Sequence, residues 1–364
     1  MRRQHFELFR PVCPVCRTEP SAFHFLDLAH IDKERDDQII EGLLHCSNIS
    51  CQREYPIIDG IPLIIADIRR YLTDNAFQVC LRSDLGAMIE SVLGDCCGPG
   101  SSFDAVRQQL SSYTWDHYGD LDPMEPSSDL GPGSMERVLE QGLAMADVSG
   151  FDSGPILDIG CSVGRSSFAL AQRFDQPVLG IDLNFPMLRL AGKVLRDGSV
   201  CYPRRRVGVV YDRREFPVSF RNSANVDFWA CDATALPIGS NRIGGAVSMN
   251  LLDCVHSPLE FLASTASVLR PGASAVIACP YDWSVAVTAM EGWFGGHSQR
   301  GPDAGESEPV LRRLLTPGQP QSIPNLELAA EDNFPWHVRM HDRSIVAYQC
   351  HTVVARKTDQ LADA

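Results

Sequence analysis

Three acidic residues each lie at the end of a short apolar run, and a glycine-spaced turn follows the first of them. Asp158 precedes Gly160 and Gly164 in "ILDIGCSVG", Asp182 ends "VLGID", and Asp232 follows "VDFWAC". An acid in the second of these positions can accept hydrogen bonds from both hydroxyls of a ribose. An acid in the third position suits the exocyclic amine of an adenine. The pattern therefore predicts a site for an adenosine-containing ligand.

The residues of the turn argue against a pyrophosphate. A dinucleotide-binding turn has the pattern Gly-x-Gly-x-x-Gly, whose second glycine lets the backbone approach the phosphates. Ser162 occupies that place here, and no Lys-Ser or Lys-Thr pair follows the turn. Three carboxylates favour a ligand with positive charge, and S-adenosylmethionine carries a sulfonium and an ammonium but no phosphate. We therefore expect S-adenosylmethionine, the alternative being ordinary aspartates at strand ends.

Alternating strand-like and helical segments position these acids. Short apolar runs alternate with amphipathic stretches from residue 154 onward, which predicts an α/β fold with a mostly parallel, doubly wound sheet and helices on both faces. Ligands of such Rossmann-like sheets bind at the carboxyl ends of the strands. The expected strands are 155–160, 177–182, 226–233, 244–252 and 274–280, and the expected helices are 165–174, 185–197 and 258–270.

Residues 150–285 resemble class I S-adenosylmethionine-dependent methyltransferases in the order and spacing of these elements. The resemblance implies that the first turn surrounds the methionine, that the second strand end binds the ribose and that the third lies at the adenine. The cofactor-binding residues that we expect are Asp158, Gly160, Cys161, Gly164, Asp182, Asp232, Ala233 and Asn250.

A narrower resemblance concerns the methyl acceptor. The segments "MNLLDCVHSPLEFL", "CPYDWSVAVTAMEGWFGG" and "FPWHVRMHDRSIVAYQCHTVVARK" look like the methyltransferase domain of ovothiol-pathway enzymes, over roughly residues 105–357. That domain methylates an imidazole nitrogen of a sulfur-substituted histidine. The chain departs from those enzymes in lacking their sulfur-inserting iron domain. The resemblance implies an N-methyltransferase whose substrate is a small imidazole- or thiol-containing amino acid or a related metabolite.

The expected acceptor residues follow the fourth and fifth strands. Methyl transfer mainly requires the acceptor lone pair to be aligned in a dry pocket. A neutral imidazole, with a reference pKa of about 6.5, offers its lone pair without a strong base. We therefore expect catalysis by positioning, through Asn250, Asp253 and Tyr281.

Substrate binding is expected to combine an acid, an aromatic wall and a basic clamp. Asp253 suits an imidazole N–H or an ammonium, and an arginine can hold a carboxylate through two hydrogen bonds. The alternative for each residue is packing or a solvated surface. The expected substrate-binding residues are His117, Tyr118, Asp253, Tyr281, Trp283, Arg339 and Arg343.

Four cysteines near the start of the sequence form two pairs. Cys13 and Cys16 lie in "CPVC", and Cys46 and Cys51 lie in "CSNISC". Two thiol pairs from separate turns are typical of a closed tetrahedral zinc site. His45 is an alternative ligand, and free or redox-active cysteines are the alternative to zinc.

The segment around these cysteines also resembles a known domain. "LLHCSNISCQREYPIIDGIPLII" is similar to the zinc ribbon of the small activator subunit of tRNA and protein methyltransferases. This implies a structural zinc, and either a protein partner or a homodimer formed through the ribbon. We expect a zinc-ribbon domain at 1–68, a helical connector that covers the cofactor at 69–149, the methyltransferase domain at 150–358 and a disordered tail at 359–364.

Charge and cysteine content limit the function classes. The 364 residues carry a net charge of -14, which disfavours broad attraction to nucleic acid. No run of about 18 apolar residues predicts a membrane helix, and no signal peptide is recognised. The thirteen cysteines suit a reducing compartment, so we expect a cytoplasmic protein.

Two other functions remain open. Ribosomal RNA methyltransferases also join a zinc ribbon to this catalytic fold, and the arginine-rich segment 201–221 is the strongest feature in favour of an RNA substrate. That segment is otherwise a solvated face, or a lid for an anionic substrate. A non-catalytic scaffold that binds S-adenosylmethionine is the third possibility.

Overall fold

The computed structural model describes residues 1–18 and 23–358, so the predicted disordered tail lies outside the described residues. Its larger sheet has the strand order β1-β2-β3-β4-β9-β6-β5-β10-β11-β13-β12, and β7 and β8 form a separate hairpin. The strands are β1 (Leu26–Arg35), β2 (Gln38–Cys46), β3 (Glu54–Ile58), β4 (Ile61–Ile64), β5 (Ile156–Ile159), β6 (Val178–Asp182), β7 (Ser199–Val207), β8 (Val210–Pro217), β9 (Val226–Cys231), β10 (Ile243–Met249), β11 (Leu269–Cys279), β12 (Leu326–His341) and β13 (Ser344–Lys357).

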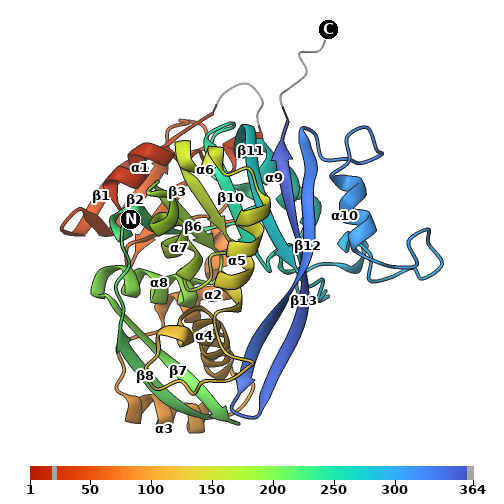
Figure 1. Cartoon of the computed structure of the whole chain (residues 1–364). Coiled ribbons are helices and arrows are strands. Elements are labelled where there is room, and N and C mark those ends of the chain that lie inside the picture. Colours follow the sequence, from red (N-terminus) through yellow and green to blue (C-terminus); the bar gives the residue numbers. More distant parts are fainter. Residues whose placement is uncertain (19–22, 359–364) are drawn as a thin grey trace.

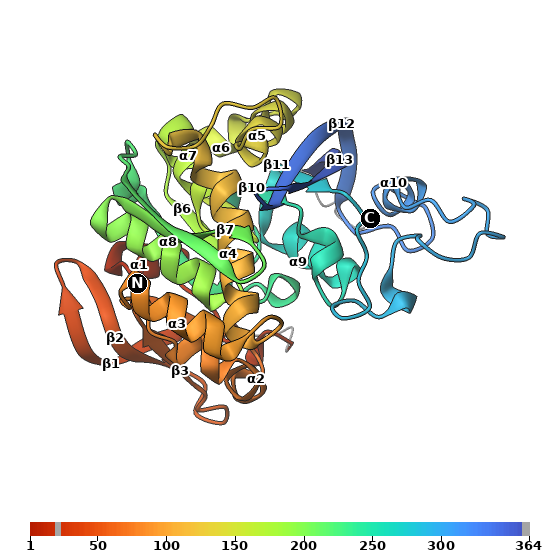
Figure 2. The ribbon, with the colours of Figure 1, turned by 90° about the horizontal axis from the view of Figure 1, so that it is seen from below.

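Helices cover both faces of this sheet. The α-helices are α1 (Arg3–Phe9), α2 (Ile68–Cys80), α3 (Ala87–Cys97), α4 (Ser102–Tyr118), α5 (Ser134–Met145), α6 (Ser149–Ser153), α7 (Arg165–Phe174), α8 (Phe185–Asp197), α9 (Pro258–Val268) and α10 (Glu308–Leu314). Short 3-10 turns include η4 (Ala233–Ala235) and η5 (Leu252–Cys254). Side chains of α4, α5, α7 and α8 share one core, and those of α9 and α10 share the other (Figure 2).

The predicted α/β fold class is confirmed. Strands β9, β6, β5, β10 and β11 run parallel, and β13 pairs with β11 in the antiparallel sense. Every residue of β5, β9 and β10 is buried. Parallel strands covered on both faces must be apolar along their whole length, which is why these runs were recognisable without an alternating pattern.

The cysteine-rich region continues the same sheet. Strand β4 pairs in parallel with β9, with Leu63 opposite Ala230 and Ile64 opposite Cys231. On one face the ring of Phe9 packs edge-on against Trp229, with 6.0 Å between the ring centroids. The first 65 residues therefore share a hydrophobic core with the strands that carry the predicted site.

Three elements meet at the carboxyl edge of the parallel strands. The hydroxyl of Tyr118, at the end of α4, donates to the carbonyl of Val163 in the first turn, at 2.8 Å. The β12–β13 hairpin continues past the end of β11 and reaches β7, where the amide of Asp342 donates to the carbonyl of Arg206 at 3.1 Å (Figure 1). Helix α4 and the two hairpins therefore form a cover on this edge.

The arginine-rich segment is the β7–β8 hairpin, and its arginines are neither free nor simply solvated. Arg204 binds Glu125 and Asp342 at 2.9 and 2.6 Å, and Arg214 binds Asp122 at 3.1 Å. Arg205 donates to Gln108 and to the carbonyl of Gly208, Arg206 lies 3.7 Å from Asp212, and Arg213 donates to the carbonyl of Leu85. These contacts fix the hairpin to the rest of the cover, which removes the main feature that favoured RNA.

Candidate active site

The first turn reverses direction through three residues with left-handed backbone. Gly160, Ser162 and Gly164 have φ angles of 78°, 52° and 88°. The amides of Gly160 and Cys161 both donate to the carbonyl of Ile181 in β6, at 2.8 and 2.9 Å. Ser162 is a non-glycine residue in this conformation, and its amide is held by a carboxylate oxygen of Asp182 at 2.9 Å.

Gly164 is required by both its conformation and its neighbours. A Cβ there would lie 2.6 Å from Cζ of Phe228 and 2.8 Å from Cβ of Ala191. We expect Gly164→Ala to lower the free energy of unfolding by about 3 kcal/mol, from overpacking and a disfavoured φ together. Gly208→Ala is the control, because its φ is 56° and no atom lies within 4 Å of the new Cβ. Equal losses in urea denaturation of the two variants would contradict the packing argument.

Asp158 supports the turn from behind. Its side chain is 1% exposed and accepts hydrogen bonds from the hydroxyls of Ser166 and Ser167, both at 2.6 Å. Burial raises the pKa of Asp158 to about 6. The carboxylate joins the end of β5 to the first turn of α7, so its geometry is that of a residue that positions the turn.

Asp182 lies at the mouth of the predicted cofactor site. One oxygen accepts from the amide of Ser162, and the other accepts from the amide of Asn184 at 2.8 Å. Burial raises the pKa of Asp182. Each oxygen keeps a further lone pair, which is what two ribose hydroxyls need.

The remaining predicted cofactor residues differ in which of their atoms can face a ligand. Asp232 caps η4 by accepting from the amide and hydroxyl of Thr234, both through Oδ1. Oδ2 has no hydrogen bond with the described residues and lies 4.0 Å from Nδ1 of His256. Ala233 begins η4 and is buried. The side chain of Cys161 is fully buried, so only its backbone can face a ligand.

The structure brings Asn250 and Asp253 together with two residues that the sequence analysis did not select. Asn250 has a φ of 57° and accepts a hydrogen bond from the thiol of Cys350 at 3.3 Å. Asp253 is 2% exposed and accepts from the amide of Asp282 at 2.7 Å. The Asp282 carboxylate in turn accepts from the hydroxyl of Tyr348 at 2.9 Å. We call Asp253, Asp282 and Tyr348 the acceptor cluster.

Tyr113 lies on α4, and its side chain is 41% exposed. Burial of its hydroxyl raises the pKa of Tyr113, and the charges of Cys254, Asp182 and Asp253 raise it further. No local spacing in the sequence distinguishes Tyr113 from a packing residue of its helix.

Tyr281 and Trp283 point away from the acceptor cluster. The hydroxyl of Tyr281 lies 2.7 Å from Nδ1 of His351, whose Nε2 lies 3.0 Å from Glu331. The Trp283 ring stacks on Trp293 with 6.0 Å between centroids. These contacts support packing for both residues, in place of the expected aromatic wall.

The arginines expected to clamp a carboxylate are also engaged or misplaced. Arg339 is 3% exposed, forms an ion pair with Asp342 and donates to the carbonyl of Arg205 at 2.7 Å. Arg343 lies in the short link between β12 and β13. Both arginines lie near the turn of the β12–β13 hairpin, and this geometry argues against a clamp for a substrate carboxylate.

His117 and Tyr118, at the end of α4, are both buried. His117 is 5% exposed, and burial lowers its pKa to about 3, so the ring is neutral at pH 7. Tyr118 is fully buried and holds the first turn through Val163. Of the two interpretations of this aromatic group, the geometry favours packing of α4 on the turn.

A buried acid next to this pair predicts a dependence of stability on pH. Asp116 accepts from the amide of Ser134 at 2.8 Å, and burial raises its pKa to about 7. Between pH 4 and 7 the folded protein retains a proton that the unfolded chain has lost, so this residue destabilises the fold as pH rises. We expect Asp116→Asn to gain stability relative to wild type from pH 4 to 8. Urea denaturation across this range tests it, and a pH-independent difference would contradict it.

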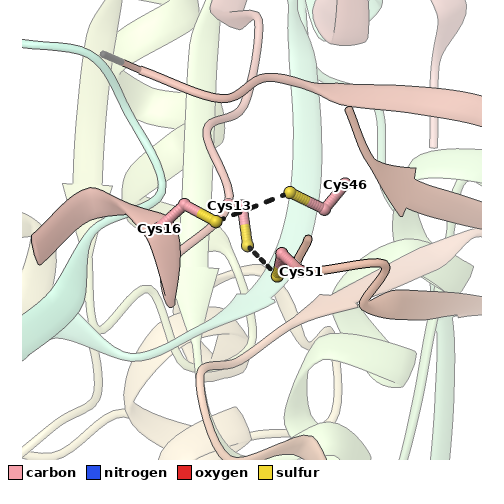
Figure 3. A group of neighbouring side chains, drawn as sticks. All are labelled: Cys13, Cys16, Cys46 and Cys51. Atoms are coloured by element: carbon pink, nitrogen blue, oxygen red, sulfur yellow. Dashed lines mark hydrogen bonds between the residues drawn. The ribbon is translucent and has the colours of Figure 1, made fainter. Parts of the chain in front are cut away.

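The four paired cysteines converge as predicted. Their sulfur atoms all lie within 4.8 Å of one another, with 3.9 Å between Cys13 and Cys51 and 3.7 Å between Cys16 and Cys46 (Figure 3). Sulfurs bound to one tetrahedral zinc at about 2.3 Å are about 3.8 Å apart. These spacings are too long for disulfides and fit a zinc ion. The set does not include His45, because it precedes Cys46 on β2 and neighbouring side chains of a strand point to opposite faces.

Comparison with known proteins identifies the class of the sheet domain. Residues 157–277 match the family model described as "Methyltransferase domain". The curated O-methyltransferase cnsE of Penicillium expansum is 27% identical over 175 residues, which cover 48% of this chain and 54% of the relative. This chain thus matches about half the length of that relative.

Solved methyltransferase structures are also similar. A SAM-dependent methyltransferase from Methanosarcina mazei is 22% identical, with a TM-score of 0.39, over 57% of this chain and 93% of that chain. A chain from the complex between the Haloferax volcanii Trm112 methyltransferase activator and a methyltransferase is 14% identical, with a TM-score of 0.37, over 62% and 93%.

Residues 157–277 thus match a methyltransferase domain, and the observed sheet is the mostly parallel α/β sheet that the sequence predicted for it. Within the described residues, no helix has the length and apolar character to span a membrane.

Proposed function

We propose that this protein transfers the methyl group of S-adenosylmethionine to a nitrogen of a small imidazole- or thiol-containing amino acid, of the thiohistidine type. The observation that carries the proposal is the acceptor cluster, whose Asp253 and Asp282 follow β10 and β11 at the edge of the sheet where Asp182 ends β6.

The chemistry of the cluster favours a nitrogen acceptor. Asp253 and Asp282 are hydrogen-bond acceptors when ionised, and they suit an imidazole N–H or an ammonium group. Burial raises the pKa of Asp253, so a cationic or N–H ligand gains from pairing with it. A substrate carboxylate, by contrast, would meet no arginine here, because Arg339 is paired with Asp342.

The protein's part in the reaction is then to position the acceptor. S-adenosylmethionine supplies the electrophilic methyl group when bound. Asp182 orients the ribose, Asp253 holds an N–H of the acceptor, and Asn250 offers its amide at the end of β10. The cover formed by α4 and the hairpins excludes water from the reacting atoms.

The proposal is tested by methyl transfer to defined acceptors. Purified protein is incubated with methyl-labelled S-adenosylmethionine and histidine, thiohistidines and related imidazoles. We expect label on a ring nitrogen, and we expect Asp253→Asn to lower kcat/KM by about tenfold or more with unchanged affinity for S-adenosylmethionine. The matched control is Asp332→Asn, which changes an exposed acid of β12. Absence of label in every imidazole would sink the nitrogen proposal.

An oxygen acceptor is the second candidate, because the curated relative is an O-methyltransferase. Phenols and catechols therefore belong in the same assay. An oxygen acceptor must lose its proton, so its rate would rise with pH, whereas a neutral imidazole would show a plateau above pH 7. Turnover on neither class, with S-adenosylmethionine binding intact, would favour the scaffold hypothesis.

We also propose that Cys13, Cys16, Cys46 and Cys51 hold one structural zinc. The support is the spacing of the four sulfurs and the closed set of four ligands, which leaves no open position for catalysis. None of the thirteen cysteines, which all lie within the described residues, forms a disulfide, and this supports a reducing compartment such as the cytoplasm. A homodimer or protein partner that uses the ribbon stays a prediction.

A further inference from the structure

A cavity lies between α3, α4, α8 and β7, and none of the acceptor cluster lines it. Its volume is about 100 Å³, and it opens to solvent. The walls are mainly apolar, and they include Leu81, Leu85, Phe103, Val106 and Leu190.

A buried arginine in the cavity wall has two side-chain nitrogens without a hydrogen-bonding partner among the described residues. Arg107 is 7% exposed, and its guanidinium stacks over the ring of Tyr211 at 3.9 Å and faces Phe103 at 5.4 Å. Its Nε and Nη1 are buried without a partner among the described residues. Ring stacking occupies the face of a guanidinium and leaves the N–H groups in its plane unsatisfied. Such a group is costly unless an acceptor binds it.

The other basic residues of the lining divide into two kinds. Arg82 binds Asp84 at 2.8 Å, and Arg189 binds Asp59 at 2.8 Å. Arg213 donates to the carbonyl of Leu85 at 2.6 Å and lies 3.9 Å from Glu90. Lys193 is half-buried and forms no hydrogen bond or ion pair with the described residues. Glu90 is the single acid among the lining residues of the described cavity. Two cations, Arg107 and Lys193, are therefore available to one ligand.

Helix α3 contributes Glu90 to the lining of this cavity and has little buried surface of its own. Gly94 is the one residue of α3 that is buried, and a Cβ there would lie 2.1 Å from Nη1 of Arg107. The glycine thus makes room for the guanidinium beneath the helix. Met88 and Val92 of the same helix are 78% and 52% exposed. A helix with so little burial can open at low cost, which would give a ligand access.

We propose that this cavity binds an amphipathic carboxylate, with an aliphatic body against the apolar walls and the carboxylate on Arg107 and Lys193. A carboxylate supplies the planar acceptor that a guanidinium binds best. The apolar lining selects for a hydrocarbon body, because its burial is the main favourable term.

The test uses isothermal titration of the full-length protein with octanoate, and with octylamine as a probe of equal length and opposite charge. We expect octanoate to bind at least about tenfold more tightly than octylamine. Arg107→Met should weaken octanoate binding by about tenfold or more, since it keeps the apolar stem and removes the guanidinium. Arg82→Met is the matched control, because that arginine also lines the cavity but is already paired.

Binding of S-adenosylmethionine reports whether each variant is folded. If Arg107→Met does not fold, Lys193→Met serves in its place, with an expected loss of about threefold to tenfold. Undetectable octanoate binding by wild type, equal affinity for the two probes, or an unchanged affinity in the folded variant would each overturn the proposal.

Discussion

Replacing Asp182 by alanine is expected to weaken binding of S-adenosylmethionine by about a hundredfold or more. Two hydrogen bonds from ribose hydroxyls to a carboxylate are together worth about 3 kcal/mol, which corresponds to that factor. The substitution also releases the amide of Ser162, a residue held at a φ of 52°. The first loss acts on the bound state alone, and the second loosens the turn in the free protein as well, so both lower the affinity.

Isothermal titration with S-adenosylmethionine measures this effect. Asp182→Asn keeps one oxygen and should give an intermediate loss. Asp129→Ala is the matched control, because Asp129 is an exposed loop acid. An affinity of Asp182→Ala within about threefold of wild type would show that the ribose binds elsewhere.

Local chemistry explains why the helices of the sheet domain could be predicted closely. The helix expected at 185–197 is observed as α8 with the same bounds. Asn184 caps its first turn by accepting from the amide of Met187, and Gly198 ends it in the left-handed conformation. Start, stop and apolar face are all encoded within these few residues.

The cysteine set was predictable for the same reason. Each pair lies in one short turn, so the spacing within "CPVC" and "CSNISC" already brings two sulfurs together. The sheet then joins the two turns, since Cys46 ends β2. Only the choice between Cys46 and His45 as the ligand required knowledge of β2, because neighbouring side chains of a strand point to opposite faces.

The acceptor side could not be predicted as well, because its residues meet through long-range packing. Tyr348 reaches Asp282 only through the register of the long β12–β13 hairpin, in which it lies opposite Trp336. No spacing in the sequence records that contact.

The arginines show the same limit of prediction from sequence. Here the sequence suggested a contact with substrate, whereas the structure shows contacts within the protein. Arg339 has the chemistry of a carboxylate clamp, and its carboxylate turns out to be Asp342, three residues away. The same acid binds Arg204 of the β7–β8 hairpin at 2.6 Å. The charges that suggested an anionic substrate instead hold the two hairpins of the cover together.

Removal of the proposed zinc is expected to destabilise the whole protein, not only its first 65 residues. Structural zinc sites contribute about 10 kcal/mol or more to the folding of small peptides. Here the cysteine-rich region supplies β4, which pairs with β9, and Phe9, which packs on Trp229. Unfolding of that region would expose β9, the strand that lies next to β6 and its terminal Asp182.

Chelation, or the substitution Cys46→Ser, should therefore lower Tm by about 10 °C in a single transition, which for a chain of 364 residues corresponds to a loss of about 8 kcal/mol. Affinity for S-adenosylmethionine should fall in parallel, because the ribose-binding strand loses its neighbour. Cys80→Ser is the control, since Cys80 is an exposed thiol outside the cluster.

Metal analysis of the purified protein should find one zinc per chain. Two separate transitions would contradict the shared core, and a metal-free protein with unchanged Tm in Cys46→Ser would favour unligated thiols. Sensitivity of Tm to reductant without zinc would instead indicate redox-active cysteines.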